Sequence, residues 1–275
     1  AETALNNRPQ RRFADLQTAL DADRDGGAEL TLLADVTGDY TIDGTQDTGL
    51  DLNGHCIKGA VTVKAAAGSN TTTFSNTQNT TTASIDAVVA YRGAKLAGTR
   101  YPAVIGKLTL AEGATWKTIL NDTALGYKVL NADGTYKWYT PNDVKDSQLN
   151  NVIINSLPIT FKTLNLKVDG KNLTGNSPEV ERGTTVQLCA SCNTNGADVT
   201  FSILKKGETT PITLTKPSYA GGKYTKDYSF DTIGEYTIYF TATKDGYTVQ
   251  SAKKKLTVTK AAIPASAITA PAANA

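Results

Sequence analysis

Ile233-Gly234-Glu235-Tyr236-Thr237-Ile238-Tyr239-Phe240-Thr241-Ala242-Thr243 is the stretch that says most about the fold of this chain. A glycine turn is followed at once by side chains that alternate, which is the period of two of a β-strand with one buried face. Tyr236, Ile238 and Phe240 fall on one side of that strand. The stretch therefore predicts one strand of a β-sandwich.

Other runs between residues 159 and 260 alternate in the same way, at 164–168, 184–188, 199–204, 224–230 and 252–259. Together they approach the roughly seven strands over about 100 residues of an immunoglobulin-like sandwich. Thr232-x-Gly234-x-Tyr236-x-Ile238 resembles the tyrosine-corner strand of such domains, with Ile238 where antibody domains carry a cysteine. The resemblance is to bacterial Ig-like modules, and it implies an Ig-like β-sandwich held by hydrophobic packing alone.

The N-terminal part has a different pattern. Phe13, Leu16 and Leu20 recur at helical spacing and predict one amphipathic helix over residues 7–23. After Gly26-Gly27, the run from Glu29 to Val36 predicts a buried strand. We expect the helix to cover the end of the structure that follows.

Short apolar groups, each bounded by Gly, Asn or Asp, then recur from Leu30 to Leu120. Strands this short cannot each bury a face, but the stacked turns of a solenoid share one core. The pattern predicts a right-handed parallel β-helix. An irregular antiparallel sandwich has the same period and stays open as the alternative.

Three segments at the start of the chain, 13–20, 30–37 and Leu50-Asp51-Leu52-Asn53-Gly54-His55, resemble the opening of β-helical regions in large surface proteins of Gram-positive gut bacteria. The resemblance covers roughly the first third of the chain. It implies a solenoid capped by the N-terminal helix, in a modular protein of the bacterial cell surface.

Three regions follow from these patterns. We predict a β-helical domain over 1–157, an Ig-like sandwich over 158–260 and a linker over 261–275, with the boundary at Ser156-Leu157-Pro158. The last region contains only Ala, Ile, Pro, Ser, Thr and Asn, a composition that resembles a linker between modules.

An aromatic hairpin is the main candidate site. Asn131-Ala132-Asp133-Gly134-Thr135 predicts a tight turn between the arms 127–130 and 135–139. Tyrosine and tryptophan offer large contact areas with a polar tip, and they anchor protein and sugar partners. The candidate ligand-binding residues are Trp116, Tyr127, Tyr136, Trp138 and Tyr139. The alternative is that these rings seal the last turn of the solenoid.

Composition limits the partners. The chain of 275 residues carries 28 basic and 26 acidic residues, so no strong field would attract nucleic acid or an anionic membrane. No run approaches the roughly 18 apolar residues of a membrane span. We expect no nucleic-acid partner, no membrane insertion and no cofactor, and a monomeric fragment of a larger extracellular chain.

The metal and thiol candidates are weak in sequence. Asp21, Asp23 and Asp25 with Gly26 match the first half of a calcium loop, but Leu32 stands where a closing carboxylate is needed, so a plain acidic turn is the alternative. Cys189-Ala190-Ser191-Cys192 allows a local disulfide or buried thiols, and a zinc site lacks further ligands.

Three functions remain open. The first is a non-enzymatic binding or adhesion module that recognises a host protein, such as an immunoglobulin, or a glycan. The second is a structural stalk that spaces a binding head. The third is a carbohydrate-active enzyme on the β-helix, for which Asp35, Asp43, Asp47, Asp51 and Asp86 are candidate carboxylates, with Arg92 and Arg100 as charge stabilisers.

Overall fold

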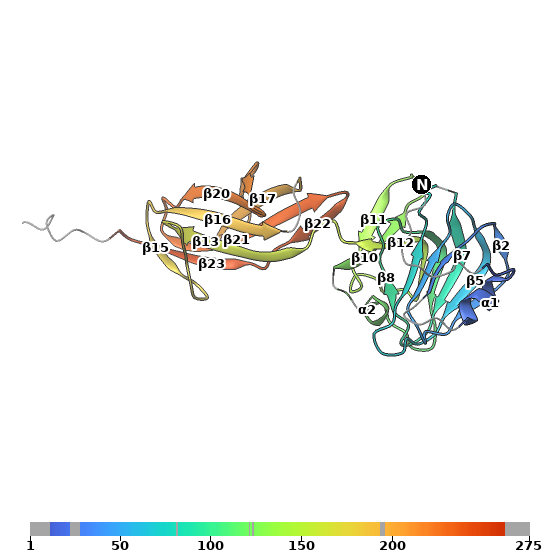
Figure 1. Cartoon of the computed structure of the whole chain (residues 1–275). Helices are drawn as coiled ribbons and strands as arrows, with labels where there is room; N and C mark the ends of the chain where they lie inside the picture. Colours follow the sequence, from blue (N-terminus) through green and yellow to red (C-terminus); the bar gives the residue numbers. More distant parts are fainter. Residues whose placement is uncertain are drawn as a thin grey trace, which may run out of the picture. The chain divides into compact units, whose positions relative to one another are not determined.

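The computed structural model describes residues 12–22, 28–80, 82–120, 122, 124–192 and 196–261. Strands make up 51% of the chain and helices 4%, so the protein is mainly β (Figure 1). It divides into two compact units, Ala1–Leu157 and Pro158–Ala275, and the division falls next to Pro158.

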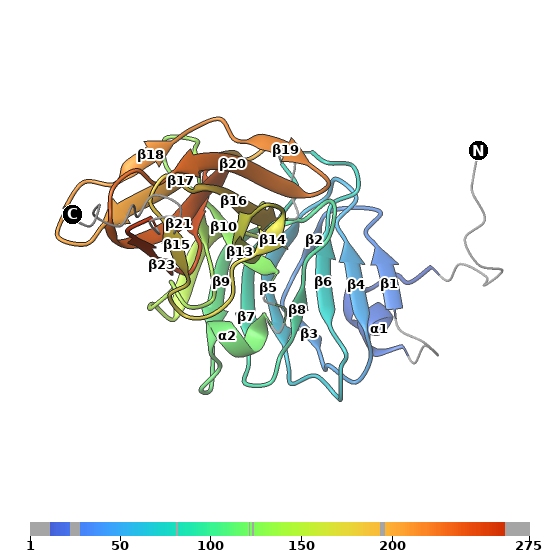
Figure 2. The same ribbon diagram turned by 90° about the vertical axis from the view of Figure 1, so that its left-hand side faces the viewer.

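Unit 1 is a β-solenoid of about four turns. Parallel pairing joins β1, β4, β6 and β8 into one sheet, and β2 and β3, β5, β7 and β9 into a second (Figure 2). These registers confirm the predicted solenoid, and they exclude the antiparallel sandwich for this part of the chain. The strands are β1 (Ala28–Thr31), β2 (Val36–Thr37), β3 (Tyr40–Ile42), β4 (Thr48–Asp51), β5 (Ile57–Val63), β6 (Thr72–Ser75), β7 (Ser84–Ala90), β8 (Leu96–Ala97) and β9 (Val104–Leu110).

One predicted strand is wrong in its extent. The run from Glu29 to Val36 is not continuous, because the chain turns a corner between β1 and β2. Leu33, at that corner, is 69% exposed. An apolar run in the sequence therefore contains a corner of the solenoid that period alone does not reveal.

Apolar side chains stack from turn to turn and form the core. Ile57, Ile85 and Ile105 occupy one register position in successive strands, and each is at most 1% exposed. Burying such a side chain contributes about 1.5–3 kcal/mol, so a strand too short to enclose a core gains its stability from the turns on either side.

Aspartates at the corners bond successive turns to each other. Asp35 Oδ1 accepts a hydrogen bond from the Cys56 amide at 3.0 Å, and this bond is the main cause that lowers the pKa of Asp35. Asp51, only 5% exposed, accepts from the Thr77 amide at 2.9 Å and the Thr77 hydroxyl at 2.5 Å. These carboxylates therefore act as clamps between turns.

Helix α1 (Leu16–Asp21) is shorter than the predicted 7–23. Asp15 is its N-cap and accepts a hydrogen bond from the Thr18 amide at 2.8 Å, which lowers the pKa of Asp15. Phe13 precedes this cap and lies outside the helix, while 7–11 and 23 lie outside the described residues. Leu16 and Leu20 are buried in the core of unit 1.

The side-chain amide of Gln17 takes the place of a neighbouring strand. Gln17 Nε2 donates to the Thr41 carbonyl at 2.9 Å, and Gln17 Oε1 accepts from the Thr41 amide at 2.7 Å. Thr41 lies in β3, and among the strands of the described residues β3 pairs with β5 alone. One glutamine thus satisfies both backbone groups of an edge residue.

The second sheet ends in antiparallel strands. β12 (Gln148–Ser156) pairs with β9, β10 (Leu125–Leu130) with β12, and β11 (Tyr136–Tyr139) with β10, which confirms the predicted hairpin. The short helix α2 (Trp116–Ile119) was not predicted, although Thr115 and Thr118 form a capping box at its start.

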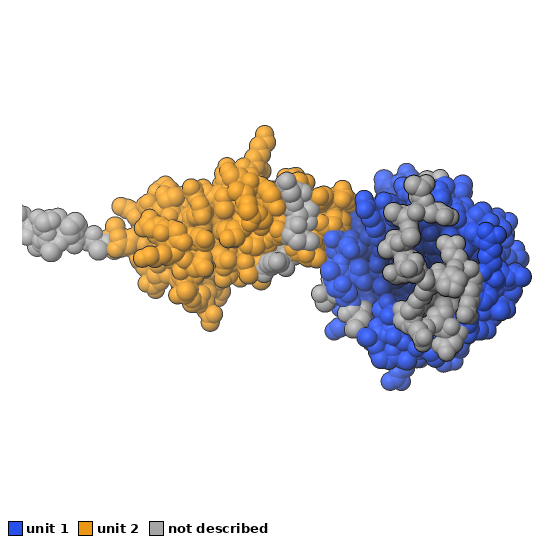
Figure 3. All heavy atoms as spheres, viewed as in Figure 1, with its two compact units in different colours: residues 1–157 blue, residues 158–275 orange. Residues whose placement is uncertain are grey.

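Unit 2 is the part coloured orange in Figure 3. It consists of two sheets around one core. The first has the order β14-β13-β16-β20-β19, and the second β15-β23-β21-β17-β18, with β22 paired to β21. The bounds are β13 (Phe161–Val168), β14 (Lys171–Asn172), β15 (Glu179–Glu181), β16 (Thr185–Cys192), β17 (Asp198–Lys205), β18 (Ile212–Leu214), β19 (Ser218–Ala220), β20 (Lys223–Ser229), β21 (Gly234–Lys244), β22 (Tyr247–Gln250) and β23 (Lys254–Thr259).

The stretch from Gly234 onward behaves as its alternation predicts. In β21 the side chains of Tyr236, Ile238 and Phe240 are at most 5% exposed, whereas those between them are more accessible. The Tyr236 hydroxyl donates to the Thr232 carbonyl at 2.7 Å. The short strands β14, β15, β18, β19 and β22 were not predicted, because alternation over two to four residues cannot be told from chance.

The three cysteines, all in the described part of the chain, form no disulfide. Cys189 and Cys192 are both buried in β16. Residues three apart in a strand point to opposite faces, which explains why these two thiols do not meet. Of the predicted alternatives, the structure has buried thiols.

Candidate functional site

The hairpin β10–β11 sorts the candidate aromatic residues onto two faces. Tyr127 lies opposite Tyr139, and Lys128 lies opposite Trp138. Because opposite residues of an antiparallel pair share a face, the first pair faces one way and the second the other. Tyr136 joins the face of Trp138, as the alternation of the arm predicts.

Trp116 and Tyr127 are core residues, which corrects their prediction as surface contacts. They are 4% and 0% exposed, and their rings lie 4.9 Å apart edge to face. Trp116 Nε1 donates to the Asp146 carbonyl at 2.6 Å, and the Tyr127 hydroxyl donates to the Trp116 carbonyl at 3.2 Å. Burial raises the pKa of Tyr127. Large rings whose polar atoms find partners inside are stable in a core.

The opposite face of the hairpin carries a cation between two rings. We define the aromatic face as Lys128, Leu130, Tyr136 and Trp138. Lys128 Nζ lies 3.8 Å from the centre of the Tyr136 ring and 5.9 Å from that of Trp138. Tyr136 is 38% exposed and Trp138 is half-buried. An ammonium group within about 6 Å of a ring centre is attracted to the ring face, so Lys128 favours this arrangement of Tyr136 and Trp138.

Tyr139 belongs to the other side of the sheet. It is half-buried and packs against the core of unit 1, while Lys137 Nζ lies 4.7 Å from its ring centre. Of the five predicted residues, Tyr136 and Trp138 therefore share the outward face, and Tyr139 contributes at most its rim.

The turn that carries the aromatic face is held by its own side chains. Asp133 accepts hydrogen bonds from the Thr135 amide at 2.9 Å and the Thr135 hydroxyl at 2.6 Å, and these bonds lower the pKa of Asp133. The Asn131 amide donates to the Thr135 carbonyl at 2.8 Å. The register of the two arms is therefore fixed at the turn.

Lys128 was not predicted as a site residue. The signal was nevertheless present, because a turn at 131–135 requires pairing between Lys128 and Trp138. Reading the two arms as a pair, and not each by itself, would have found it.

The carboxylates proposed for an enzyme serve mainly as turn and corner bonds. Asp43 accepts from the Thr45 amide at 2.9 Å and Asp47 from the Thr71 amide at 2.7 Å, alongside the clamps of Asp35 and Asp51. Asp86 is exposed in β7. Arg100 lies 5.2 Å from the ring of Tyr101, and Arg92 is exposed.

No metal site is formed by the described residues, in which no three His, Cys, Asp or Glu side chains come together. Asp21 accepts a hydrogen bond from Gln17 Nε2 at 2.7 Å, whereas Asp23 and Asp25 lie outside the described residues. His55 Nδ1 lies 3.5 Å from Asp35, whose other oxygen lies 3.9 Å from Lys58 Nζ.

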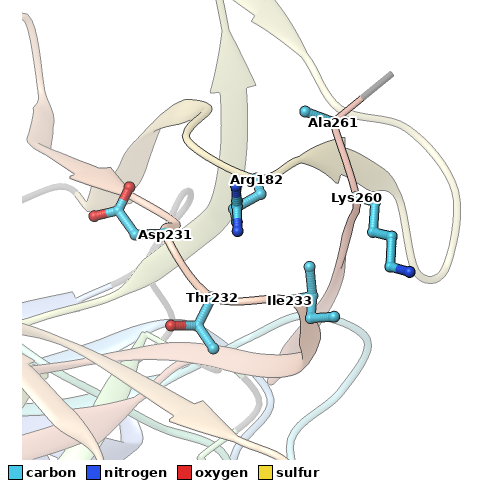
Figure 4. Close-up of a pocket in the computed structure, with 6 residues that line it drawn as sticks. All are labelled: Arg182, Asp231, Thr232, Ile233, Lys260 and Ala261. Carbon is cyan, nitrogen blue, oxygen red and sulfur yellow. The ribbon is translucent and has the colours of Figure 1, made fainter. Parts of the chain in front are cut away.

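A second candidate lies in unit 2 and has no counterpart in the sequence analysis. We call it the Arg182 pocket; it is lined by Arg182, Asp231, Thr232, Ile233, Lys260 and Ala261 (Figure 4). In the view of Figure 4 the Arg182 side chain lies between those of Asp231 and Ile233. No sequence signal marks this pocket, because its three segments are far apart along the chain.

Comparison with known proteins finds no family model that matches the chain and no curated protein similar to it. Among the helices of the described residues, none has the length and apolar character needed to cross a bilayer.

Proposed function

We propose that this chain is an extracellular, non-enzymatic binding module of a modular surface protein of Gram-positive gut bacteria, and that its aromatic face recognises a host protein, such as an immunoglobulin, or a glycan. The start of the chain resembles such proteins, as described above. Recognition rests on shape and on aromatic contacts, because basic and acidic residues nearly balance.

The proposal includes a finer assignment of the fold. We assign unit 2 to the Ig-like sandwiches, because β13, β16, β20 and β19 follow the order A-B-E-D and β23, β21 and β17 the order G-F-C. The hydrogen bond from Tyr236 to Thr232 has the geometry of a tyrosine corner. We assign unit 1 as a right-handed coil, the usual hand of parallel crossovers, with α1 as its cap.

Support for the capping role comes from two kinds of contact. Leu16 and Leu20 of α1 bury against the solenoid core. Gln17 occupies both backbone groups of Thr41 in an edge strand. Covering an edge in this way prevents pairing with another chain.

The observation that carries the binding proposal is the geometry of Lys128, Tyr136 and Trp138. A lysine positioned over two rings on an outer sheet face orders these side chains before a partner arrives, which lowers the entropy cost of binding. Aromatic side chains of this kind commonly contribute about 2 kcal/mol or more when they are buried in an interface.

A matched pair of variants tests this proposal. Tyr136 and Tyr101 are 38% and 37% exposed, and each has a basic side chain near its ring. We expect Tyr136→Ser to weaken binding to immobilised purified mucin or immunoglobulin G at least tenfold, and Tyr101→Ser to leave it unchanged. Surface plasmon resonance on the whole chain measures both. Equal losses in the two variants would contradict a role for the aromatic face.

A structural spacer is the second candidate. It is favoured by the burial of Trp116 and Tyr127, which places part of the aromatic cluster inside the solenoid. A spacer predicts no measurable binding of either host protein to the wild-type chain, with both units fully folded. That result would replace the binding proposal.

A further inference from the structure

The Arg182 pocket is built on a rigid backbone. The Arg182 amide donates to the Thr259 carbonyl at 2.9 Å, which ties the turn after β15 to the end of β23. The Gly183 amide donates to the Phe230 carbonyl at 2.8 Å, next to the segment 231–233. The Tyr236 hydroxyl holds that segment through the Thr232 carbonyl. The three lining segments are therefore fixed relative to one another without a ligand.

The charged side chains of the pocket, Arg182, Asp231 and Lys260, are exposed on unit 2. Nearby, Lys206 pairs with Glu235 at 2.9 Å. Neither Arg182 nor Asp231 forms an ion pair among the described residues of the chain. Residues 158–275 contain 14 Lys and Arg against 9 Asp and Glu, so this unit attracts anions. The Arg182 guanidinium offers a planar fork that matches a carboxylate.

The remaining lining residues favour a ligand that has hydroxyl groups and an apolar surface in addition to its negative charge. Asp231 makes no side-chain hydrogen bond that the structure records among its described residues, and the Thr232 hydroxyl, which interacts with the Tyr236 hydroxyl, keeps its lone pairs. Both therefore offer acceptor oxygens to hydroxyl groups. Ile233 is 44% exposed, which is unusual for an isoleucine and gives the pocket an apolar wall. The site thus combines a carboxylate receptor, hydroxyl partners and an apolar surface.

We propose that the Arg182 pocket binds an acidic sugar residue of a glycan. The sugar carboxylate would meet Arg182, its hydroxyl groups would meet Asp231 and Thr232, and the C–H face of its ring would rest on Ile233. An acidic peptide fits less well, because it would bring carboxylates to Asp231 without a hydroxyl donor. Lys260 contributes positive charge at the rim, and its ammonium group points away from Arg182 in Figure 4.

This pocket shares no residue with the aromatic face, so the two proposals fail or succeed separately. The probe is D-glucuronic acid, with D-glucose and acetate as the uncharged and the hydroxyl-free controls, added to the whole ¹⁵N-labelled chain. We expect amide shifts at 182–183 and 231–233 with a Kd of about 1 mM, as is typical for so few atoms. Glucose and acetate should bind at least tenfold more weakly.

Variants separate the parts of the site. Arg182→Gln should weaken glucuronate binding at least tenfold, while Lys171→Ala, which removes one exposed positive charge from β14, should not change it. Asp231→Ala should weaken glucuronate and leave acetate binding equal or stronger. Because all three residues are exposed, the spectra themselves report whether each variant is folded.

Two results would overturn the inference. If acetate binds as tightly as glucuronate, the pocket is an anion site and the sugar assignment is wrong. If Lys171→Ala weakens binding as much as Arg182→Gln, attraction is a property of the whole charged unit. If the amides of 182–183 and 231–233 do not shift at a glucuronate concentration about 50 times the expected Kd of about 1 mM, the pocket does not bind the sugar.

Discussion

Gln17→Ala tests how the first edge of the solenoid is protected. The substitution removes the donor to the Thr41 carbonyl at 2.9 Å and the acceptor for the Thr41 amide at 2.7 Å. Each such bond contributes about 0.5–1.5 kcal/mol net. Both residues are half-buried, so water replaces the lost partners only in part. We expect unit 1 to lose about 2 kcal/mol of unfolding free energy, of which the better helix propensity of alanine returns a few tenths.

Tryptophan fluorescence measures this loss in unit 1 alone, because Trp116 and Trp138 are the two tryptophans of the chain and both lie there. With a urea dependence of about 2 kcal/mol per molar, the midpoint should fall by about 1 M. Asp21→Ala is the matched control, since it removes the third hydrogen bond of Gln17 at 2.7 Å and leaves the two bonds to Thr41 intact.

The control sets the refuting result. If Gln17→Ala and Asp21→Ala shift the urea midpoint equally, water forms hydrogen bonds with the Thr41 amide and carbonyl as well as the glutamine does. Gln17 would then not protect the edge of β3, and α1 would act only through the burial of Leu16 and Leu20.

The other predictions concern the aspartate clamps of unit 1, the hydrogen bond from Tyr236 to Thr232 in unit 2, and the loss of stability at low pH. Asp51→Ala should cost unit 1 about 3 kcal/mol, because it removes a carboxylate, only 5% exposed, that accepts two hydrogen bonds from Thr77, and urea unfolding followed by tryptophan fluorescence tests it. Tyr236→Phe should lower the stability of unit 2 by about 1 kcal/mol in calorimetry, whereas Tyr239→Phe, on the outer face, should not. The pKa values of Asp35, lowered mainly by the Cys56 amide, and of Glu235, lowered by Lys206, lie below their ordinary values. The stability that Asp35 contributes to unit 1 and Glu235 to unit 2 is thus complete above the unfolded-state pKa of about 4, and it is lost as pH falls through their folded-state pKa values. A urea midpoint that stays constant in both units between pH 6 and pH 2 would contradict this.

Much of the fold could be predicted from short-range pattern. The period of two after Gly234 predicted β21, and the turn residues at 131–135 predicted the hairpin, because both signals lie within a few residues of the structure they specify. The recurring apolar groups predicted the solenoid for the same reason. The predicted helix was too long, because Asp15 is the N-cap and the helix begins only at Leu16, after Phe13.

Short-range sequence patterns predicted less of the candidate site. Trp116 and Tyr136 are both large aromatic residues with polar neighbours in the sequence, and the sequence does not distinguish them. In the structure, the Trp116 side chain is 4% exposed and the Tyr136 side chain 38%. Which face of a strand is covered depends on the neighbouring layer, and that layer comes from distant parts of the chain. The same holds for the Arg182 pocket, which joins residues 182, 231–233 and 260–261.

By itself, the sequence determined where the longer strands and the hairpin turn at 131–135 form, because alternation, glycine and asparagine act on the backbone next to them. Only the tertiary structure decided which aromatic side chains reach solvent, which carboxylates become clamps between turns, and which charges of unit 2 line the Arg182 pocket. Those outcomes depend on register and on packing between residues that are 20 or more positions apart, as for Gln17 and Thr41, separated by 24. No local pattern carries that information.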